Sequence, residues 1–118
     1  MDKQELNKKL AEWRGLKDFQ IFADHAGRYY KMQFIDPEHS QLYIVCDAFY
    51  LSLDACFQWL VPQLAGWEVA YKYYLTGKIY HAKVWAKDGI RREGWDKTNP
   101  ALALCLAIEK LIDSETPK

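Results

Sequence analysis

The sequence predicts an α+β domain in which three helices pack against a mostly antiparallel sheet. Helical patterns occur at the start, in the middle and at the end of the chain. Segments rich in β-forming residues lie between them in two groups of three, which gives the order α-β-β-β-α-β-β-β-α. The turns within each group are short, and short turns join antiparallel neighbours.

The chain has 118 residues, half of them apolar, which fits one domain over 1–118 with a substantial core. Its 16 Lys and Arg balance 16 Asp and Glu, so no strong signal for duplex nucleic acid is present. The N-terminus is polar and unlike a signal peptide. Apolar runs are far shorter than the ~20 residues that span a membrane. We expect a soluble, cytoplasmic protein.

The first helix is predicted over Lys3–Trp13. Asp2 is a suitable N-cap, and Leu6 and Leu10 follow helical spacing. Gly15 is expected to end this helix, because glycine is favoured just after a helical C-terminus.

Three strands are expected to follow, at residues 17–24, 28–36 and 41–46. The first two flank His25-Ala26-Gly27, a suitable hairpin turn. Asp36-Pro37-Glu38-His39 provides the second turn.

The second helix is predicted over Ser52–Leu64, with Ser52 as its cap. Apolar residues recur there at spacings of three and four, so one face is apolar. Pro62 removes a backbone donor near the end, where we expect a kink or a tightened last turn. Gly66 is expected to end the helix.

A hairpin is predicted from the strands 67–75 and 78–86 around Thr76-Gly77. A two-residue turn would place Tyr73 opposite Tyr80 and Tyr71 opposite Ala82. This pairing sorts the side chains onto two faces. The more polar face collects Glu68, Ala70, Lys72, Tyr74, Ile79, His81, Lys83 and Trp85.

A last strand is predicted at 90–95, followed by a helix that Asn99 caps and Pro100 begins. Every residue over 101–108 is apolar. Such a helix either packs centrally or lies at a subunit interface.

Three segments, "ELNKKLAEWRGL", "SLDACFQWLVPQL" and "TNPALALCLAIEKLID", resemble the phage ABA sandwich domain proteins in order and spacing. These are small proteins of phages and prophages. The resemblance implies an α/β/α-type sandwich and a phage origin, with the host cytoplasm as the location. It carries no catalytic motif onto this chain. It also implies that the proline-containing helix is a structural element of the family.

Catalytic and metal chemistry find little support in the sequence. Cys46, Cys56 and Cys105 form no CxxC pair and are expected to be reduced thiols. Histidines are scattered, and the turn over 36–39 is better explained as a turn than as a set of metal ligands. No nucleophile-elbow pattern is present. We therefore expect no enzyme, no metal and no cofactor.

The segment over 72–97 is basic and aromatic. It holds seven Lys and Arg against three Asp and Glu, a local charge of +4. Rings that stack a base beside cations that hold phosphate are what a nucleotide requires. The candidate ligand-binding residues are Lys72, Tyr74, His81, Lys83, Trp85, Arg91 and Arg92. Only one of the two arginines can share the polar face, because neighbouring strand residues point to opposite sides.

These observations favour a small non-enzymatic binding protein that sequesters an anionic, nucleotide-like host immune signal and so counters host defence. The first alternative is a protein-interaction or homo-oligomeric module, favoured by the surplus aromatic residues and the apolar last helix. The second is a solvated sheet face on which lysines extend along apolar neighbours. The binding hypothesis requires an aromatic-lined pocket with at least one convergent Lys or Arg. Lys83, Trp85 and the arginines scattered on open, convex surface would count heavily against it.

Overall fold

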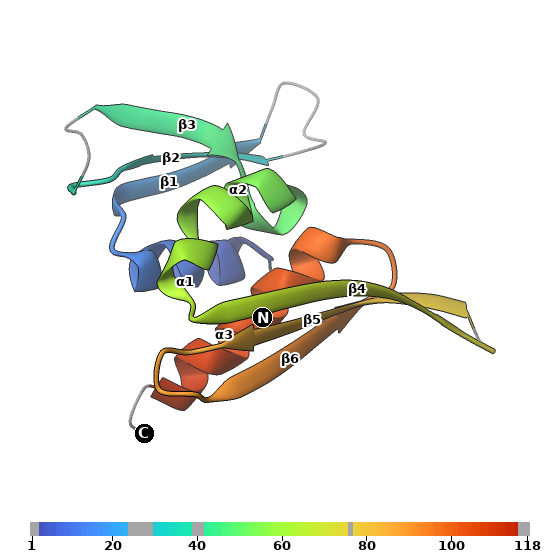
Figure 1. The fold of residues 1–118 in the computed structure, drawn as a ribbon. Helices are drawn as coiled ribbons and strands as arrows, with labels where there is room; N and C mark the ends of the chain where they lie inside the picture. The colour runs from blue at the N-terminus through green and yellow to red at the C-terminus, as the bar shows by residue number, and fades with distance from the viewer. Residues whose placement is uncertain (1–2, 24–29, 39–41, 76, 116–118) are drawn as a thin grey trace.

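The computed structural model describes residues 3–23, 30–38, 42–75 and 77–115 (Figure 1). The elements are α1 (Lys3–Arg14), β1 (Lys17–Ala23), β2 (Tyr30–Ile35), β3 (Tyr43–Asp47), η1 (Phe49–Leu51), α2 (Leu53–Trp59), η2 (Val61–Gln63), β4 (Gly66–Tyr74), β5 (Gly77–Trp85), β6 (Arg91–Asp96) and α3 (Pro100–Glu115), where η denotes a 3-10 helix. The predicted α+β class, the order of helices and strands, and the antiparallel pairing are confirmed.

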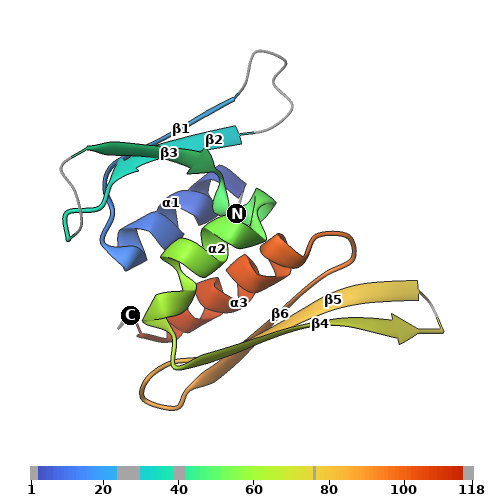
Figure 2. The ribbon, with the colours of Figure 1, turned by 45° about the horizontal axis from the view of Figure 1, so that its top comes forward.

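The layers differ from the expected α/β/α sandwich, because the strands form two separate sheets, β1-β2-β3 and β4-β5-β6. The helices lie between these sheets, so the layer order is sheet, helix, sheet (Figure 2). Each sheet turns an apolar face inward: Met32 and Phe34 of the first and Ala82 and Val84 of the second are fully buried. Two inward faces need a shared apolar layer, which the helices supply.

Helix α1 ends at the predicted glycine. Gly15 has a φ of 83°, and its N–H donates to the carbonyl of Glu12 at 3.0 Å. The N–H of Leu16 donates to the carbonyl of Ala11 at 3.1 Å. These two bonds form a Schellman stop, in which glycine adopts the left-handed backbone without steric cost. The predicted cap, Asp2, lies outside the described residues.

The first sheet has the expected meander. Strand β2 pairs antiparallel with β1 and β3, and Ile21, Met32 and Cys46 lie side by side on its inner face. Strand β3 extends to Asp47, one residue past the predicted end. The expected turn at His25-Ala26-Gly27 lies outside the described residues.

The helix predicted over 52–64 is shorter than expected. Ser52 caps it, and its Oγ accepts the N–H of Ala55 at 3.1 Å. The α-helix ends at Trp59, and Pro62 lies in the separate 3-10 turn η2. Proline has no N–H to continue the helical bonds, and its ring clashes with the carbonyl four residues earlier. The chain therefore tightens before Pro62, which is a structural role.

The β4–β5 hairpin differs from the predicted pairing by two residues. Tyr71 lies opposite Tyr80, not Ala82, and Tyr73 lies opposite Lys78. Gly77 pairs with Tyr74 as the first residue of β5, so it is not a turn residue. A shift of two leaves every side chain on its face, so the predicted sorting into two faces is confirmed.

Two smaller boundaries were also wrong. Gly66 begins β4 and does not end the preceding helix. Strand β6 begins and ends one residue later than predicted, at Arg91–Asp96.

Helix α3 packs centrally, which is the first of the two arrangements expected for it. Asn99 caps it as predicted, because its Oδ1 accepts the N–H of Leu102 at 3.2 Å. The fully buried side chains of α3 are Ala103, Leu104, Cys105, Ala107, Ile108 and Leu111. Burial within the chain thus accounts for its apolar sequence. No helix in the described part of the chain is long and apolar enough to cross a membrane.

Candidate functional site

The predicted site residues lie on the second sheet, most of them on the face turned away from α3. Ala82 and Gly94 are opposite each other on the covered face, so Lys72, Tyr74, His81, Lys83, Trp85 and Arg91 lie on the outer face. Arg92 lies on the covered side, where its Nε donates to Ser114 Oγ of α3 at 2.8 Å. The prediction that one arginine alone shares the outer face is confirmed.

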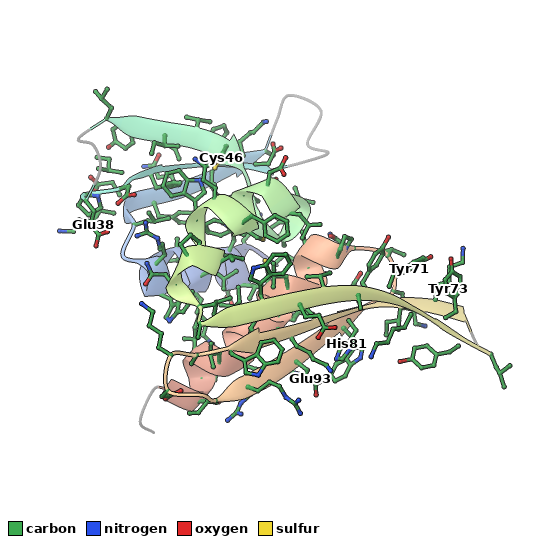
Figure 3. All side chains as sticks on the ribbon, viewed as in Figure 1. Glu38, Cys46, Tyr71, Tyr73, His81 and Glu93 are labelled. Carbon is green, nitrogen blue, oxygen red and sulfur yellow. The ribbon has the colours of Figure 1, made fainter. Side chains whose placement is uncertain are left out.

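His81 is enclosed by its neighbours. Its ring stacks on Trp95 with centroids 4.7 Å apart and planes 10° from parallel. Its Nε2 lies 2.9 Å from Glu93 Oε1, and the residue is only 4% exposed. The imidazole is therefore a packed part of the sheet and presents little surface to a ligand (Figure 3).

The remaining outer-face residues are divided between the two ends of the sheet. Lys83 lies between Glu68 and Glu93 in the strand register, so neighbouring carboxylates offset its charge. Trp85 lies between Gly66 and Arg91 at one end. The structure therefore does not bring Lys83, Trp85 and Arg91 together with Lys72 and Tyr74.

Lys72 and Tyr74 lie at the other end, where β4 and β5 continue past β6. The last pair between β5 and β6 is Tyr80 with Asp96. Beyond it a pocket of about 300 Å³ opens, lined by Tyr74, Gly77, Lys78, Ile79 and Lys97. Tyr74 and Lys97 thus share one hollow with Lys78, whose ammonium group points to the other face toward Tyr71 and Tyr73, and the end of the hairpin projects past α3 (Figures 1 and 2).

Lys78 and Lys97 were absent from the predicted site. Both lysines belong to the basic segment over 72–97, but no pattern in the sequence indicates that they line the same pocket. Lys97 reaches the pocket because β6 ends beside Ile79, and Lys78 because Gly77 is already in the strand. The β4–β5 register therefore determines the position of Lys78, and the end of β6 determines that of Lys97.

The opposite face of the hairpin end carries an aromatic cluster. The Tyr71 and Tyr80 rings are stacked, with centroids 4.6 Å apart, and the Tyr71 and Tyr73 centroids are 5.2 Å apart. Lys78 Nζ lies 5.9 Å from the Tyr71 centroid and 5.6 Å from that of Tyr73. Figure 3 shows Tyr71 and Tyr73 on the other side of the sheet from His81 and Glu93.

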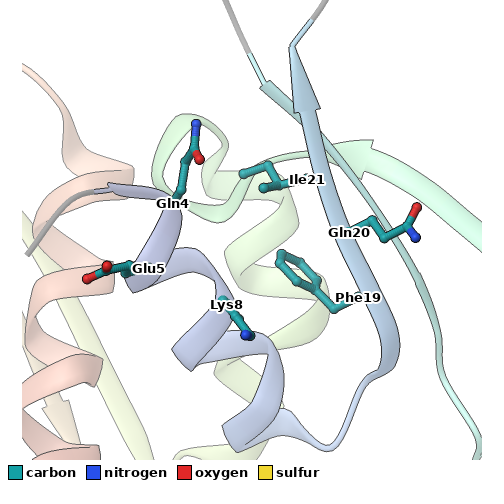
Figure 4. Close-up of a pocket in the computed structure, with 6 residues that line it drawn as sticks. All are labelled: Gln4, Glu5, Lys8, Phe19, Gln20 and Ile21. Carbon is teal, nitrogen blue, oxygen red and sulfur yellow. The ribbon is translucent and has the colours of Figure 1, made fainter.

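A second pocket, of about 370 Å³, lies between α1 and β1 (Figure 4). It is lined by Gln4, Glu5, Lys8, Phe19, Gln20 and Ile21. It combines one acidic and one basic side chain with neutral neighbours, so it has no net preference for an anion.

Cys46 and Cys105 are not activated nucleophiles. Burial, followed by the charge of Asp47, raises the pKa of Cys46 to about 11. Burial also raises the pKa of Cys105, whose Sγ lies 3.7 Å from that of Cys56 in the core. A raised pKa keeps a thiol protonated near neutral pH, and the thiolate is the nucleophilic form.

The turn that begins at Asp36 is held by structural contacts. Asp36 is fully buried, its Oδ2 lies 3.4 Å from Arg14 Nη2, and its Oδ1 accepts the N–H of Glu38 at 3.2 Å. His39 lies outside the described residues. Among the residues that the structure describes, no group of three or more His, Cys, Asp or Glu side chains is placed to hold a metal ion.

The chain matches no protein-family model, no curated protein and no solved structure. Membership of the phage ABA sandwich family, and the phage origin that it implies, therefore remain predictions from the sequence.

Proposed function

We propose that this protein is a non-enzymatic binding protein and that the end of the β4–β5 hairpin binds a small anionic ligand with an aromatic group, such as a nucleotide. The observation that carries the proposal is the pocket that Lys97 and Tyr74 line, with Lys78 at its rim and the Lys78 ammonium on the adjoining face. Ammonium groups hold phosphate, and a tyrosine ring stacks on a base.

The charges at this end favour an anion. No Asp or Glu occurs between Glu68 and Asp88 in the sequence. In the described part of the chain, Lys72, Lys78 and Lys97 form no ion pair with a carboxylate. An anionic ligand would therefore meet cations that no internal partner neutralises.

The size of the pocket fits the proposal. Small-molecule sites commonly begin at about 300 Å³, which matches the volume here. Of the predicted site residues the pocket is lined by Tyr74 alone, and it excludes Lys72, His81, Lys83, Trp85, Arg91 and Arg92. The site we propose is thus smaller than the predicted one and displaced toward the tip.

Binding without chemistry suffices for the biological role that the sequence suggests, which is to sequester a host nucleotide signal. The raised pKa values of Cys46 and Cys105 and the enclosed His81 support a protein without a nucleophile and base at this surface. The role in countering host defence is part of the proposal.

The test is a thermal-shift screen against AMP, cyclic AMP and ADP-ribose. A ligand at 100 times its dissociation constant adds about 2.7 kcal/mol of stability, which raises the melting temperature measurably. We expect Lys97→Gln and Lys78→Gln to remove the shift and Lys83→Gln, a matched loss of charge, to keep it. No shift with any of the three at millimolar concentration would overturn the proposal.

A protein-interaction module is the second candidate, favoured by one observation. Tyr73 is 72% exposed and the neighbouring Leu75 is fully exposed, so large apolar groups face solvent at the tip. Sedimentation of the purified protein tests for a homo-oligomer. A dimer that Leu75→Ser converts to a monomer would favour this candidate over a nucleotide site.

A further inference from the structure

We infer that the ligand is a single-stranded nucleic acid, which the Tyr71–Tyr73 face binds together with the pocket behind it. The inference rests on the proposed function, because it extends the same anion site to a polymer. Its basis is a repeat of ring, ammonium and ring on the face opposite the pocket.

The two rings form a stacking platform. Tyr71 and Tyr73 are two residues apart on β4, so they project from the same face, about 6.8 Å apart along the strand. Tyr71 is held against Tyr80, which fixes its orientation, whereas Tyr73 is 72% exposed. One ring is therefore preorganised and the next is open for a base to stack on.

Lys78 is placed to hold the linking phosphate. Its Nζ is nearly equidistant from the two rings, at 5.9 Å from Tyr71 and 5.6 Å from Tyr73. The phosphate of a nucleotide whose base stacks on Tyr73 would meet this ammonium group. Lys78 also lines the pocket on the other side, with Lys97. The two surfaces thus meet at Lys78, with its ammonium on the tyrosine face and Lys97 as the cation of the pocket, so a chain of nucleotides can continue from one to the other around the edge of β5.

The alternation of rings and cations favours nucleic acid over an acidic peptide. The segment between Glu68 and Asp88 holds four lysines and four tyrosines and no acid. At the hairpin end Tyr71, Tyr73 and Lys78 share one face and Lys72 and Tyr74 the other, so each face pairs rings with a cation as each nucleotide pairs a base with a phosphate. Stacking on a protein ring also requires an unpaired base, so a single strand is favoured over a duplex.

The experiment is fluorescence anisotropy of the full chain with labelled twelve-residue oligothymidylate and oligouridylate at low salt. We expect Tyr73→Ala to weaken binding about tenfold, since stacking contributes roughly 1–3 kcal/mol per base. The control is Tyr43→Ala, a tyrosine on β3 that is 55% exposed, which should leave binding unchanged. Affinity should fall as salt rises.

Three results would overturn the inference. One is that neither oligonucleotide binds while AMP still gives its thermal shift, which would leave the proposed function intact. Another is that a duplex of the same length, or polyglutamate, competes as well as the single strand. The third is that Tyr43→Ala weakens binding as much as Tyr73→Ala. If AMP and the oligonucleotides both fail, the proposed function fails with it.

Discussion

The two halves of the second sheet are built from the same strands but differ in burial: one half is covered by α3 and the other projects past it. Over α3, small and apolar residues are buried: Ala82, Val84 and Gly94. Past α3, the same hairpin carries Tyr73 and Lys78 in solvent. The first half belongs to the buried core, whereas Tyr73 and Lys78 of the second half lie outside it. Exposed rings and cations at that end are therefore where binding is best sought.

The largest expected effect is on the covered half. A Cβ added at Gly94 would lie 2.4 Å from the carbonyl oxygen of Ala103 and 2.6 Å from the N of Ala107, both backbone atoms of α3. We expect Gly94→Ala to lower the free energy of unfolding by about 3 kcal/mol, because helix and sheet must separate. Urea denaturation measures this.

The matched control is Gly66→Ala on the outer face of the same sheet. Its Cβ would meet only the Trp85 side chain, at 3.4 Å. We expect a change of well under 1 kcal/mol there. Equal losses at Gly94 and Gly66 would contradict the close packing of β6 on α3.

The next largest effect on the free energy of unfolding is expected at the start of α3, which marks the boundary between the covered and the projecting halves of the second sheet. Asn99 caps the helix and its Nδ2 also donates to the Tyr50 carbonyl at 2.7 Å. We expect Asn99→Ala to cost about 2 kcal/mol, the sum of a cap and a hydrogen bond. Asn99→Asp keeps the cap and should lose about half as much. Equal losses in chemical denaturation would show that the cap contributes nothing.

The smallest effect on stability is expected at the projecting half. Tyr73→Ala should change the free energy of unfolding by less than about 0.5 kcal/mol, because most of its side chain is already in solvent. Val84→Ala, a buried truncation in β5, should cost about 2 kcal/mol. Thermal unfolding of the pair measures the contrast, and a large loss for Tyr73→Ala would give the tyrosine cluster a structural role.

Local chemistry made much of the fold predictable. Gly15, Ser52 and Asn99 mark helix ends through their own backbone or side-chain bonds, so the sequence alone placed them. The sorting of the hairpin into two faces was also predictable, since it depends only on alternation. The pairing of Tyr74 with Gly77 was not, because a shift of two residues preserves both faces.

Long-range features were harder to predict. The strands form two sheets around a helical layer. This arrangement depends on which apolar faces of the helices and sheets pack together, and local sequence patterns do not specify that. Helix α2 ended early because Pro62 outweighed an apolar periodicity that continued past it. The predicted site residues are centred farther from the tip than the pocket that we propose, which could not be foreseen because Lys97 comes from the end of another strand.

The most direct test of the central claim is an amide NMR titration of the labelled protein with AMP. The account predicts chemical-shift changes confined to residues 71–80 and Lys97, with the amides of Lys83, Trp85 and Arg91 unmoved. Changes centred on those three residues, or on the α1–β1 pocket around Lys8 and Phe19, would contradict it. So would a spectrum that does not change at millimolar AMP.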